Sequence, residues 1–137
     1  MWDIWLSHIF FVSLQKNYCK MMNDIELVFK ESDYSIQVPN QGKLYAVRKS
    51  TNVVIGSLII YPYKDGVYLS SFRIYDSKNQ NKGIGRAMLR YIKEMCRGEK
   101  IYLSCAYDND NALHLYKSEG FDIFRDKNWF DMVCYNK

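Results

Sequence analysis

The sequence predicts an α+β fold: a mixed, mainly antiparallel sheet flanked by helices, with one parallel strand–helix–strand crossover. Three observations predict this class. Between residues 44 and 75, short runs of β-branched and aromatic residues alternate with turn residues, which is typical of antiparallel strands. At 84–95 apolar residues recur at helical spacing, and a strand-like run follows at 100–106. Because a helix separates the strands on either side of it, those two strands are expected to run parallel.

Four strands are expected before this helix. They lie at 25–30, 44–48, 53–61 and 67–75. Lys64-Asp65-Gly66 is a strong hairpin signal between the last two of them. The strands between 44 and 75 therefore form an antiparallel meander. A further short extended run is expected at 35–38, where Pro39 stops it.

Two helices and two more strands complete the fold. Gly98 lies where the first helix ends, and the apolar face of this helix consists of Ile84, Met88, Tyr91, Ile92 and Met95. A short second helix is expected at about 111–119, with Asp108 or Asn109 as its cap and Gly120 at its end. Strands at 121–124 and 129–135 close the chain.

Residues 1–22 are expected to form an atypical N-terminal segment of one domain that covers residues 1–137. Apolar residues recur at helical spacing from Trp2, so a helix is expected up to about Tyr18. The segment lacks a basic start and a small-residue cleavage site, and it is too short to span a bilayer. We therefore expect a cytoplasmic protein with no membrane partner. A true start at Met21 or Met22 stays open.

Composition limits the partners and cofactors. The formal net charge is only +4 and the basic residues are scattered, so nucleic acid is not expected as a partner, although the charge could steer an anionic ligand. The chain has four cysteines without C-x-x-C spacing and two histidines, so no metal site is expected. The cysteines are expected to be reduced thiols. Association into a homodimer stays open.

The loop at 80–87 has the features of a phosphate-binding loop. It joins a strand to the first turn of the amphipathic helix, where unpaired N–H groups and the helix dipole favour an anion. Its two glycines let the backbone approach a ligand closely, although glycines before a helix also occur in plain turns. The binding residues expected here are Gln80, Asn81, Lys82, Gly83, Ile84, Gly85, Arg86 and Ala87. The loop is not a Walker loop, because no Gly-Lys-Ser/Thr triplet follows.

Two motifs together resemble the GCN5-related N-acetyltransferase (GNAT) family. Its Q-x-x-G-x-G acetyl-CoA loop is matched by Gln80, Gly83 and Gly85. Its second signature is matched by Asn109, Ala112, Leu115, Tyr116, Gly120 and Phe121. The resemblance covers about residues 43–135. It implies an acyl-CoA N-acyltransferase-like fold and an enzyme that moves the acetyl group of acetyl-CoA directly to an amine.

The resemblance also implies roles for single residues. Tyr116 would protonate the leaving thiolate. Asn109 would hold the pantetheine arm of the cosubstrate. The main chain of Phe72, Arg73 and Ile74 would pair with this arm where two parallel strands splay apart, and a backbone N–H there would polarise the thioester carbonyl. Without the resemblance, Tyr116 is read as a core residue and Asn109 as a helix cap.

The general base and the acceptor stay open. Strand 67–75 carries no carboxylate, and the remaining candidates for moving a proton are Tyr68, Ser70, Ser71, Asp76, Asp108 and His114. A covalent route through Cys105 lacks an adjacent base. The acceptor is expected to be a small-molecule or peptide amine.

A catalytically degenerate module that binds CoA without turnover is the alternative function. Two departures from the family favour it. One is the missing carboxylate in strand 67–75, and the other is the short distance between the first two strands, where the family usually has two helices.

Overall fold

The computed structural model describes residues 24–31 and 41–137. The helix expected from Trp2 to about Tyr18 and the extended run expected at 35–38 lie outside these residues. The described part consists of seven strands, two α-helices and a single 3-10 turn, η1 (Ser77–Asn79). The strands are β1 (Ile25–Glu31), β2 (Gly42–Arg48), β3 (Val53–Tyr63), β4 (Gly66–Ile74), β5 (Lys100–Cys105), β6 (Asp122–Asp126) and β7 (Phe130–Tyr135). The helices are α2 (Ile84–Met95) and α3 (Asp110–Ser118).

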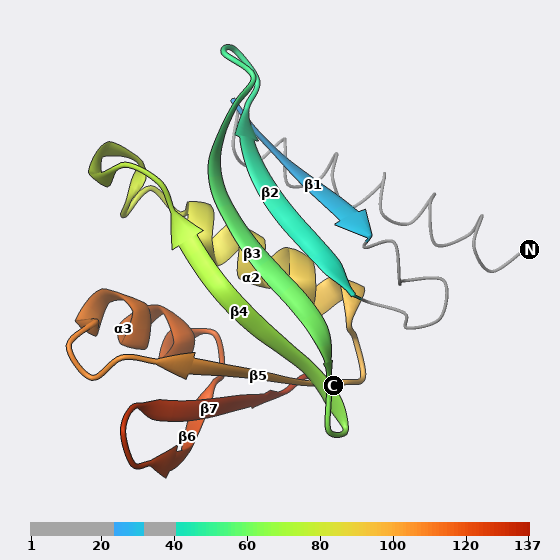
Figure 1. The fold of residues 1–137 in the computed structure, drawn as a ribbon, viewed down its shortest axis with the longest axis vertical. Coiled ribbons are helices and arrows are strands. Elements are labelled where there is room, and N and C mark those ends of the chain that lie inside the picture. The colour runs from blue at the N-terminus through green and yellow to red at the C-terminus, as the bar shows by residue number, and fades with distance from the viewer. Residues whose placement is uncertain (1–23, 32–40) are drawn as a thin grey trace, which may run out of the picture.

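The strands form one sheet in the order β1-β2-β3-β4-β5-β7-β6 (Figure 1). Every neighbouring pair is antiparallel except β4 and β5, which are parallel and connected through α2. This confirms the predicted fold class. Glu31 of β1 pairs directly with Gly42 of β2, so the first two strands are antiparallel neighbours.

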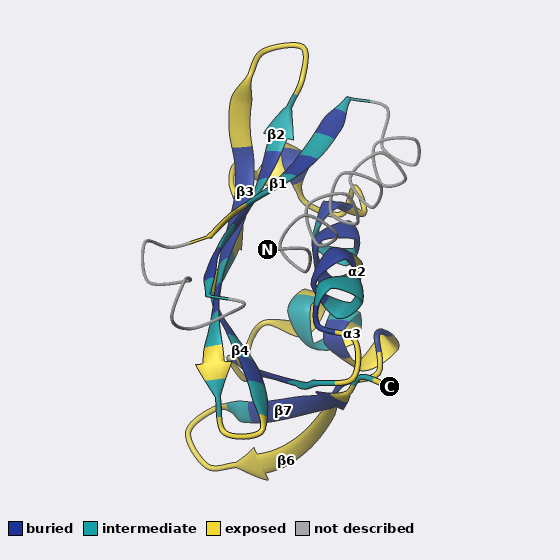
Figure 2. Ribbon diagram, turned by 90° about the vertical axis from the view of Figure 1, so that its right-hand side faces the viewer, coloured by how far each residue is buried: buried dark blue, intermediate teal, exposed yellow. Residues whose placement is uncertain are grey.

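Both described helices lie on the same side of the sheet (Figure 2). The apolar face predicted for α2 is buried except for Met95, which is half-buried, and Met88 and Ile92 are completely inaccessible to solvent. They pack in one cluster with sheet residues such as Leu44, Leu58 and Ile101. Each large side chain buried in this way contributes roughly 1.5–3 kcal/mol to folding. No helix in the described ranges is long and apolar enough to cross a membrane.

An opening separates β4 from β5 over part of their length. Their pairing is limited to Gly66 with Lys100, Val67 with Ile101 and Tyr68 with Tyr102. Beyond this point β4 continues to Ile74 without a partner on this side.

A bulge in β4 lies at the start of the opening. Ser57 of β3 pairs with Arg73 whereas Ile59 pairs with Ser70, so β4 carries one extra residue between them. Ser71 lies in this interval and has a φ of 53°, a left-handed conformation that is uncommon for residues other than glycine. Bulges bend a strand and increase its twist. The bulge therefore accounts for the divergence of β4 from β5.

Candidate active site

Two connected surface hollows lie at the opening between β4 and β5. The larger, about 620 Å³, is lined by the end of β4, the loop before α2, the first turn of α2 and one side of α3. The smaller, about 130 Å³, lies in the opening itself, between Leu69 and Ser71 of β4 and Ser104 and Cys105 of β5. Phe72, Asn109 and Tyr116 line both. We call them the cofactor groove and the transfer cavity.

Most of the residues predicted to bind the cofactor come together in the cofactor groove. They are Phe72, Arg73, Ile74, Gln80, Asn81, Gly83, Ile84, Gly85, Arg86 and Asn109, and Tyr116 joins them. Lys82 and Ala87 do not line the groove. Lys82 is exposed in the turn, whereas Ala87 is buried and its N–H donates to the carbonyl of Gly83. The Ala87 amide is therefore already used within the helix.

The start of α2 is prepared for an anion. Gly83 is its N-cap residue and adopts a left-handed conformation with φ 83°. It offers no side-chain cap, and the first turn contains no acidic residue. The N–H groups of Ile84, Gly85 and Arg86 precede the first helical hydrogen bond and remain available. A Cβ atom at Gly83 would meet nothing within 4 Å, so the space beside it is open. These features fit a pyrophosphate.

Arg86 has a partner that the sequence did not reveal. Its guanidinium donates to Glu119 at 2.5 Å, and Arg90 donates to the same carboxylate at 3.2 Å. Lys93 donates to the backbone carbonyl of Glu119 at 2.8 Å. The Glu119 side chain is only 5% exposed. These contacts hold α2 against the end of α3. The charge of Arg86 is therefore largely neutralised by Glu119, and the ion pair joins two walls of the cofactor groove.

We expect Glu119→Gln to destabilise the fold. The variant keeps a side chain of similar size but removes the charge that accepts from two arginines, at a cost of about 1–3 kcal/mol. Urea denaturation at neutral pH measures this free energy of unfolding. Glu94→Gln is the matched control, since among the described residues Glu94 pairs with Arg97, which is exposed just beyond the C-terminal end of α2. That change should cost at most about 1 kcal/mol, and equal losses in the two variants would contradict the role of Glu119.

Glu119 should also make the free energy of unfolding depend on pH in the acidic range. Burial raises the pKa of Glu119, but hydrogen bonds from Arg90 and Arg86 outweigh it and leave the pKa below the ordinary 4.5. The stabilisation is therefore complete above pH 4.5 and is lost as the pH falls through the pKa of the folded state. Stability below pH 4.5 should decline less steeply in Glu119→Gln than in the wild type.

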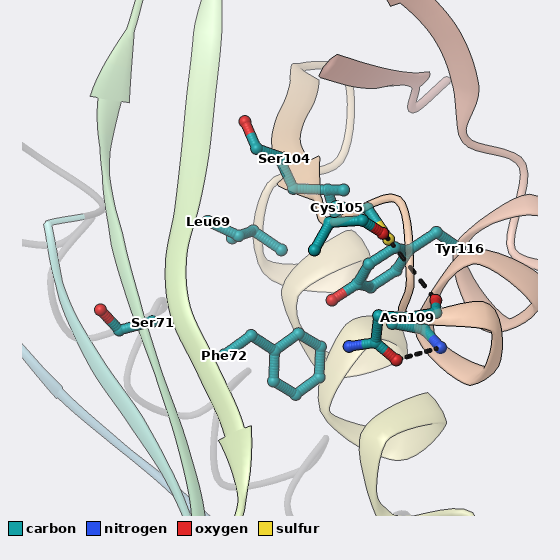
Figure 3. Close-up of a pocket in the computed structure, with 10 residues that line it drawn as sticks. Leu69, Ser71, Phe72, Ser104, Cys105, Asn109 and Tyr116 are labelled. Atoms are coloured by element: carbon teal, nitrogen blue, oxygen red, sulfur yellow. Dashed lines mark hydrogen bonds between the residues drawn. The ribbon is translucent and has the colours of Figure 1, made fainter. Parts of the chain in front are cut away.

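Tyr116 lies on α3 with its ring in the core and its hydroxyl at the transfer cavity. The residue is 8% exposed, and its ring lies 6.3 Å from that of Phe72 and 6.0 Å from that of Phe121. Figure 3 shows the hydroxyl directed into the space beside Leu69 and Phe72. No described residue forms a hydrogen bond with it. Burial, and to a smaller extent Cys105, raise the pKa of Tyr116 above the ordinary 10.0. The phenol is therefore protonated at neutral pH, as a proton donor must be.

Asn109 serves both roles that the sequence left open. It is the N-cap of α3, and its Oδ1 accepts from the N–H of Ala112 at 3.2 Å. The Nδ2 group points the other way, toward Phe72 (Figure 3). The cap fixes the side chain, and the amide N–H₂ remains available to a ligand in the groove.

Several of the candidates for moving a proton lie away from the transfer cavity. Asp76 caps η1 and pairs with Lys78, and Asp108 is exposed. His114 is exposed on the cofactor groove rather than in the transfer cavity. Burial, with a smaller effect of Asp108, raises the pKa of the Cys105 thiol, so the thiol is protonated at neutral pH and poorly suited to a covalent route.

Two serines at the transfer cavity were not fully recognised from the sequence. Ser71 was named only as one of several candidates for moving a proton, and nothing in the sequence marks its bulge. Ser104, a polar residue of β5, was not named. In Figure 3 the hydroxyl groups of Ser71 and Ser104 are directed away from Tyr116. Within the described residues, no group of three His, Cys, Asp or Glu could hold a metal ion.

The comparisons with known proteins agree with this geometry. The model of the acetyltransferase (GNAT) family matches residues 10–121. The N-alpha-acetyltransferase RimI of Mycobacterium tuberculosis is 48% identical over 46 residues, which are 34% of this chain and 29% of that protein.

Two solved structures show the same fold. An IAA acetyltransferase from Bacillus cereus has a TM-score of 0.65 at 15% identity and covers 80% of this chain and 98% of its own. Arabidopsis thaliana Naa50, in complex with the bisubstrate analogue CoA-Ac-MVNAL, has a TM-score of 0.63 at 17% identity, with 80% and 97% covered.

The fold, the uncapped start of α2 and the buried tyrosine agree with what is expected of an acyltransferase that uses a CoA thioester. The chain belongs to the acetyltransferase (GNAT) family. Its class is that of the acetyl-CoA-dependent N-acetyltransferases, with acetyl-CoA as the cosubstrate.

Proposed function

We propose that this chain transfers the acetyl group of acetyl-CoA directly to the α-amine of a polypeptide. The observation that carries the proposal is the opening between β4 and β5. Tyr116 of α3 lines it together with Ser71 and Ser104, whose hydroxyls are directed away from Tyr116 (Figure 3). An acetyl thioester and an amine can meet there without a covalent enzyme intermediate. Holding both reactants in one geometry lowers the entropic part of the barrier.

The groove suggests how acetyl-CoA would be held. The pyrophosphate would accept from the N–H groups at the start of α2. The pantetheine arm would extend along Phe72, Arg73 and Ile74 of β4, whose backbone has no strand partner on this side, and Asn109 would donate to it from α3. The thioester would then lie in the transfer cavity next to Tyr116.

The reaction balances with the residues at the site. The amine nitrogen uses its lone pair to form a bond to the thioester carbon, and the carbonyl oxygen becomes negatively charged. A backbone N–H in β4 stabilises this charge, since preorganised donors act strongly in a site sheltered from water. When the carbon–sulfur bond breaks, the electron pair moves to sulfur and the Tyr116 hydroxyl donates its proton there. The extra proton on nitrogen leaves to water, and Tyr116 is reprotonated from solvent.

A polypeptide α-amine is the acceptor class we favour. RimI, which is 48% identical over 46 residues, is an N-alpha-acetyltransferase. Naa50 was solved with the bisubstrate analogue CoA-Ac-MVNAL. The chain matches only 29% of RimI, so the acceptor is proposed from the site as well: Ser71 and Ser104 line the transfer cavity, and no described carboxylate lines it. We also propose that the protein works in the cytoplasm, where its buried cysteines 96, 105 and 134 stay reduced.

The expected result is acetylation of short peptides that have a free N-terminus. We would incubate the protein with acetyl-CoA and peptides that share one sequence, either free or blocked at the N-terminus, and follow the CoA thiol and the peptide mass. Only the free peptides should gain an acetyl group. Acetylation of lysine in the blocked peptides would contradict the α-amine assignment, and calorimetric binding of acetyl-CoA without turnover of any amine would favour the CoA-binding module.

A further inference from the structure

A chain of three hydrogen-bonded side chains borders the transfer cavity. The hydroxyl groups of Tyr68 in β4 and Ser104 in β5 lie 2.6 Å apart. Ser104 Oγ donates to Oδ1 of Asp131 in β7 at 2.9 Å. The three residues lie on three neighbouring strands, because Tyr68 is followed across the sheet by Tyr102 and Ser104 pairs with Asp131 in the strand register. The chain therefore lies across the closed end of the opening.

The direction of these hydrogen bonds follows from proton counting. A serine hydroxyl has one proton, and Ser104 gives it to Asp131. Ser104 Oγ must then accept from Tyr68, whose only hydroxyl proton is used in turn. What remains is one lone pair on Ser104 and the lone pairs of Tyr68. The hydrogen-bonded series Tyr68–Ser104–Asp131 thus presents hydrogen-bond acceptors and no donor to the cavity.

Asp131 is the fixed end of the chain. It is 9% exposed, and besides Ser104 it accepts from Arg125 Nε at 2.6 Å and from Trp129 Nε1 at 2.8 Å. Burial raises the pKa of Asp131, but the hydrogen bonds from Arg125, Ser104 and Trp129 outweigh it and leave the pKa below its ordinary value. The carboxylate is therefore ionised at neutral pH and a poor base, so it holds the chain in one direction without taking a proton.

We propose that Ser104, oriented by Tyr68 and Asp131, accepts a hydrogen bond from the N–H of the acceptor amine in the transfer cavity. Ser104 is the member of these three that lines the transfer cavity. Its hydroxyl is directed away from Tyr116 (Figure 3), so the amine would reach it from the side of the cavity opposite the proton donor. An acceptor-only group suits an amine, which still has N–H groups to satisfy while its lone pair attacks. The hydrogen bond strengthens as the nitrogen becomes positively charged during attack. Asp131 is a positioning residue that acts through Ser104.

The inference rests on the proposed transfer to an amine, and Ser104→Ala tests it. This change removes the hydroxyl and leaves Asp131 with Arg125 and Trp129. We would measure kcat and KM with a free-amine peptide and, independently of the peptide proposal, with methylamine at high concentration. We expect kcat/KM for the amine to fall at least about tenfold, while KM for acetyl-CoA stays unchanged. A fall in kcat/KM for the amine with an unchanged KM for acetyl-CoA distinguishes a role at the amine from a general loss of structure.

Two further variants complete the experiment. Ser104→Thr keeps the hydroxyl and should restore most of the activity. Ser118→Ala removes a hydroxyl from the end of α3, where Ser118 donates to the carbonyl of Leu115 and lines neither hollow, and should leave the kinetics unchanged. If Ser104→Ala acts like the wild type, or if its loss falls equally on the KM for acetyl-CoA, the inference is overturned. If the wild type acetylates methylamine but no peptide, only the peptide proposal fails. Transfer to neither amine overturns both.

Discussion

Replacing Gly83 with valine is expected to abolish binding of acetyl-CoA while the protein stays folded. Gly83 has a φ of 83°, which strains any residue with a Cβ atom by roughly 1–2 kcal/mol. Nothing lies within 4 Å of the position where the Cβ would be, so the valine meets no protein atom. It would instead occupy the space that the pyrophosphate needs. Calorimetric titration should show affinity reduced at least about 100-fold, which corresponds to about 2.7 kcal/mol.

Gly98 offers a matched control for this change. Its φ is 89°, a Cβ atom there also meets nothing within 4 Å, and it lies beyond the far end of α2, outside both hollows. Gly98→Val should therefore cost similar backbone strain but bind acetyl-CoA as the wild type does. Normal binding by Gly83→Val, or equal losses in both variants, would show that the start of α2 is not the phosphate site.

Tyr116→Phe should reduce kcat about 100-fold or more with little change in the affinity for acetyl-CoA. The ring still packs between Phe72 and Phe121, whereas the proton donor to the leaving thiolate is lost. Because none of the described residues shares a hydrogen bond with the hydroxyl, its removal should leave stability close to that of the wild type. Steady-state kinetics together with thermal unfolding distinguish the two effects.

Tyr91→Phe is the control for Tyr116→Phe. Tyr91 is a second buried tyrosine, in α2, whose pKa is raised to about 12 by burial, and it lines neither the cofactor groove nor the transfer cavity. Its substitution should leave kcat unchanged even if stability falls. Wild-type turnover by Tyr116→Phe would return Tyr116 to a purely structural role in the core.

Much of the fold could be predicted because local patterns and tertiary structure agree. The apolar faces of the strands and of α2 are the faces that the core buries, and the glycines at 98 and 120 follow their helices with φ values of 89° and 92°. Boundaries shifted where a tertiary contact decided them. Phe121 was expected to begin a strand, but its N–H donates to the carbonyl of Tyr116 at the end of α3, and β6 begins at Asp122.

The site was less predictable, because its key features join distant parts of the chain. Arg86, Arg90 and Lys93 form a basic stripe on α2, but the sequence does not reveal that it meets Glu119. The bulge at Ser71 depends on how β4 pairs with β3, and a strand pattern cannot show an extra residue that only the register reveals. The chain of Tyr68, Ser104 and Asp131 likewise exists only once three strands lie side by side.

The short pairing of β4 with β5 makes the sheet mechanically discontinuous. Strands β1 to β4 form one antiparallel sector and β5 to β7 another, and only three residue pairs join them. An extended ligand hydrogen-bonded along the free edge of β4 would act as a partial replacement strand at this seam. Ligand binding and sheet cohesion are then coupled: a ligand at 100 times its Kd adds about 2.7 kcal/mol to the stability of the folded state. The apo protein should exchange the amide hydrogens of β4 beyond Tyr68 rapidly, and saturation with acetyl-CoA should protect that stretch most.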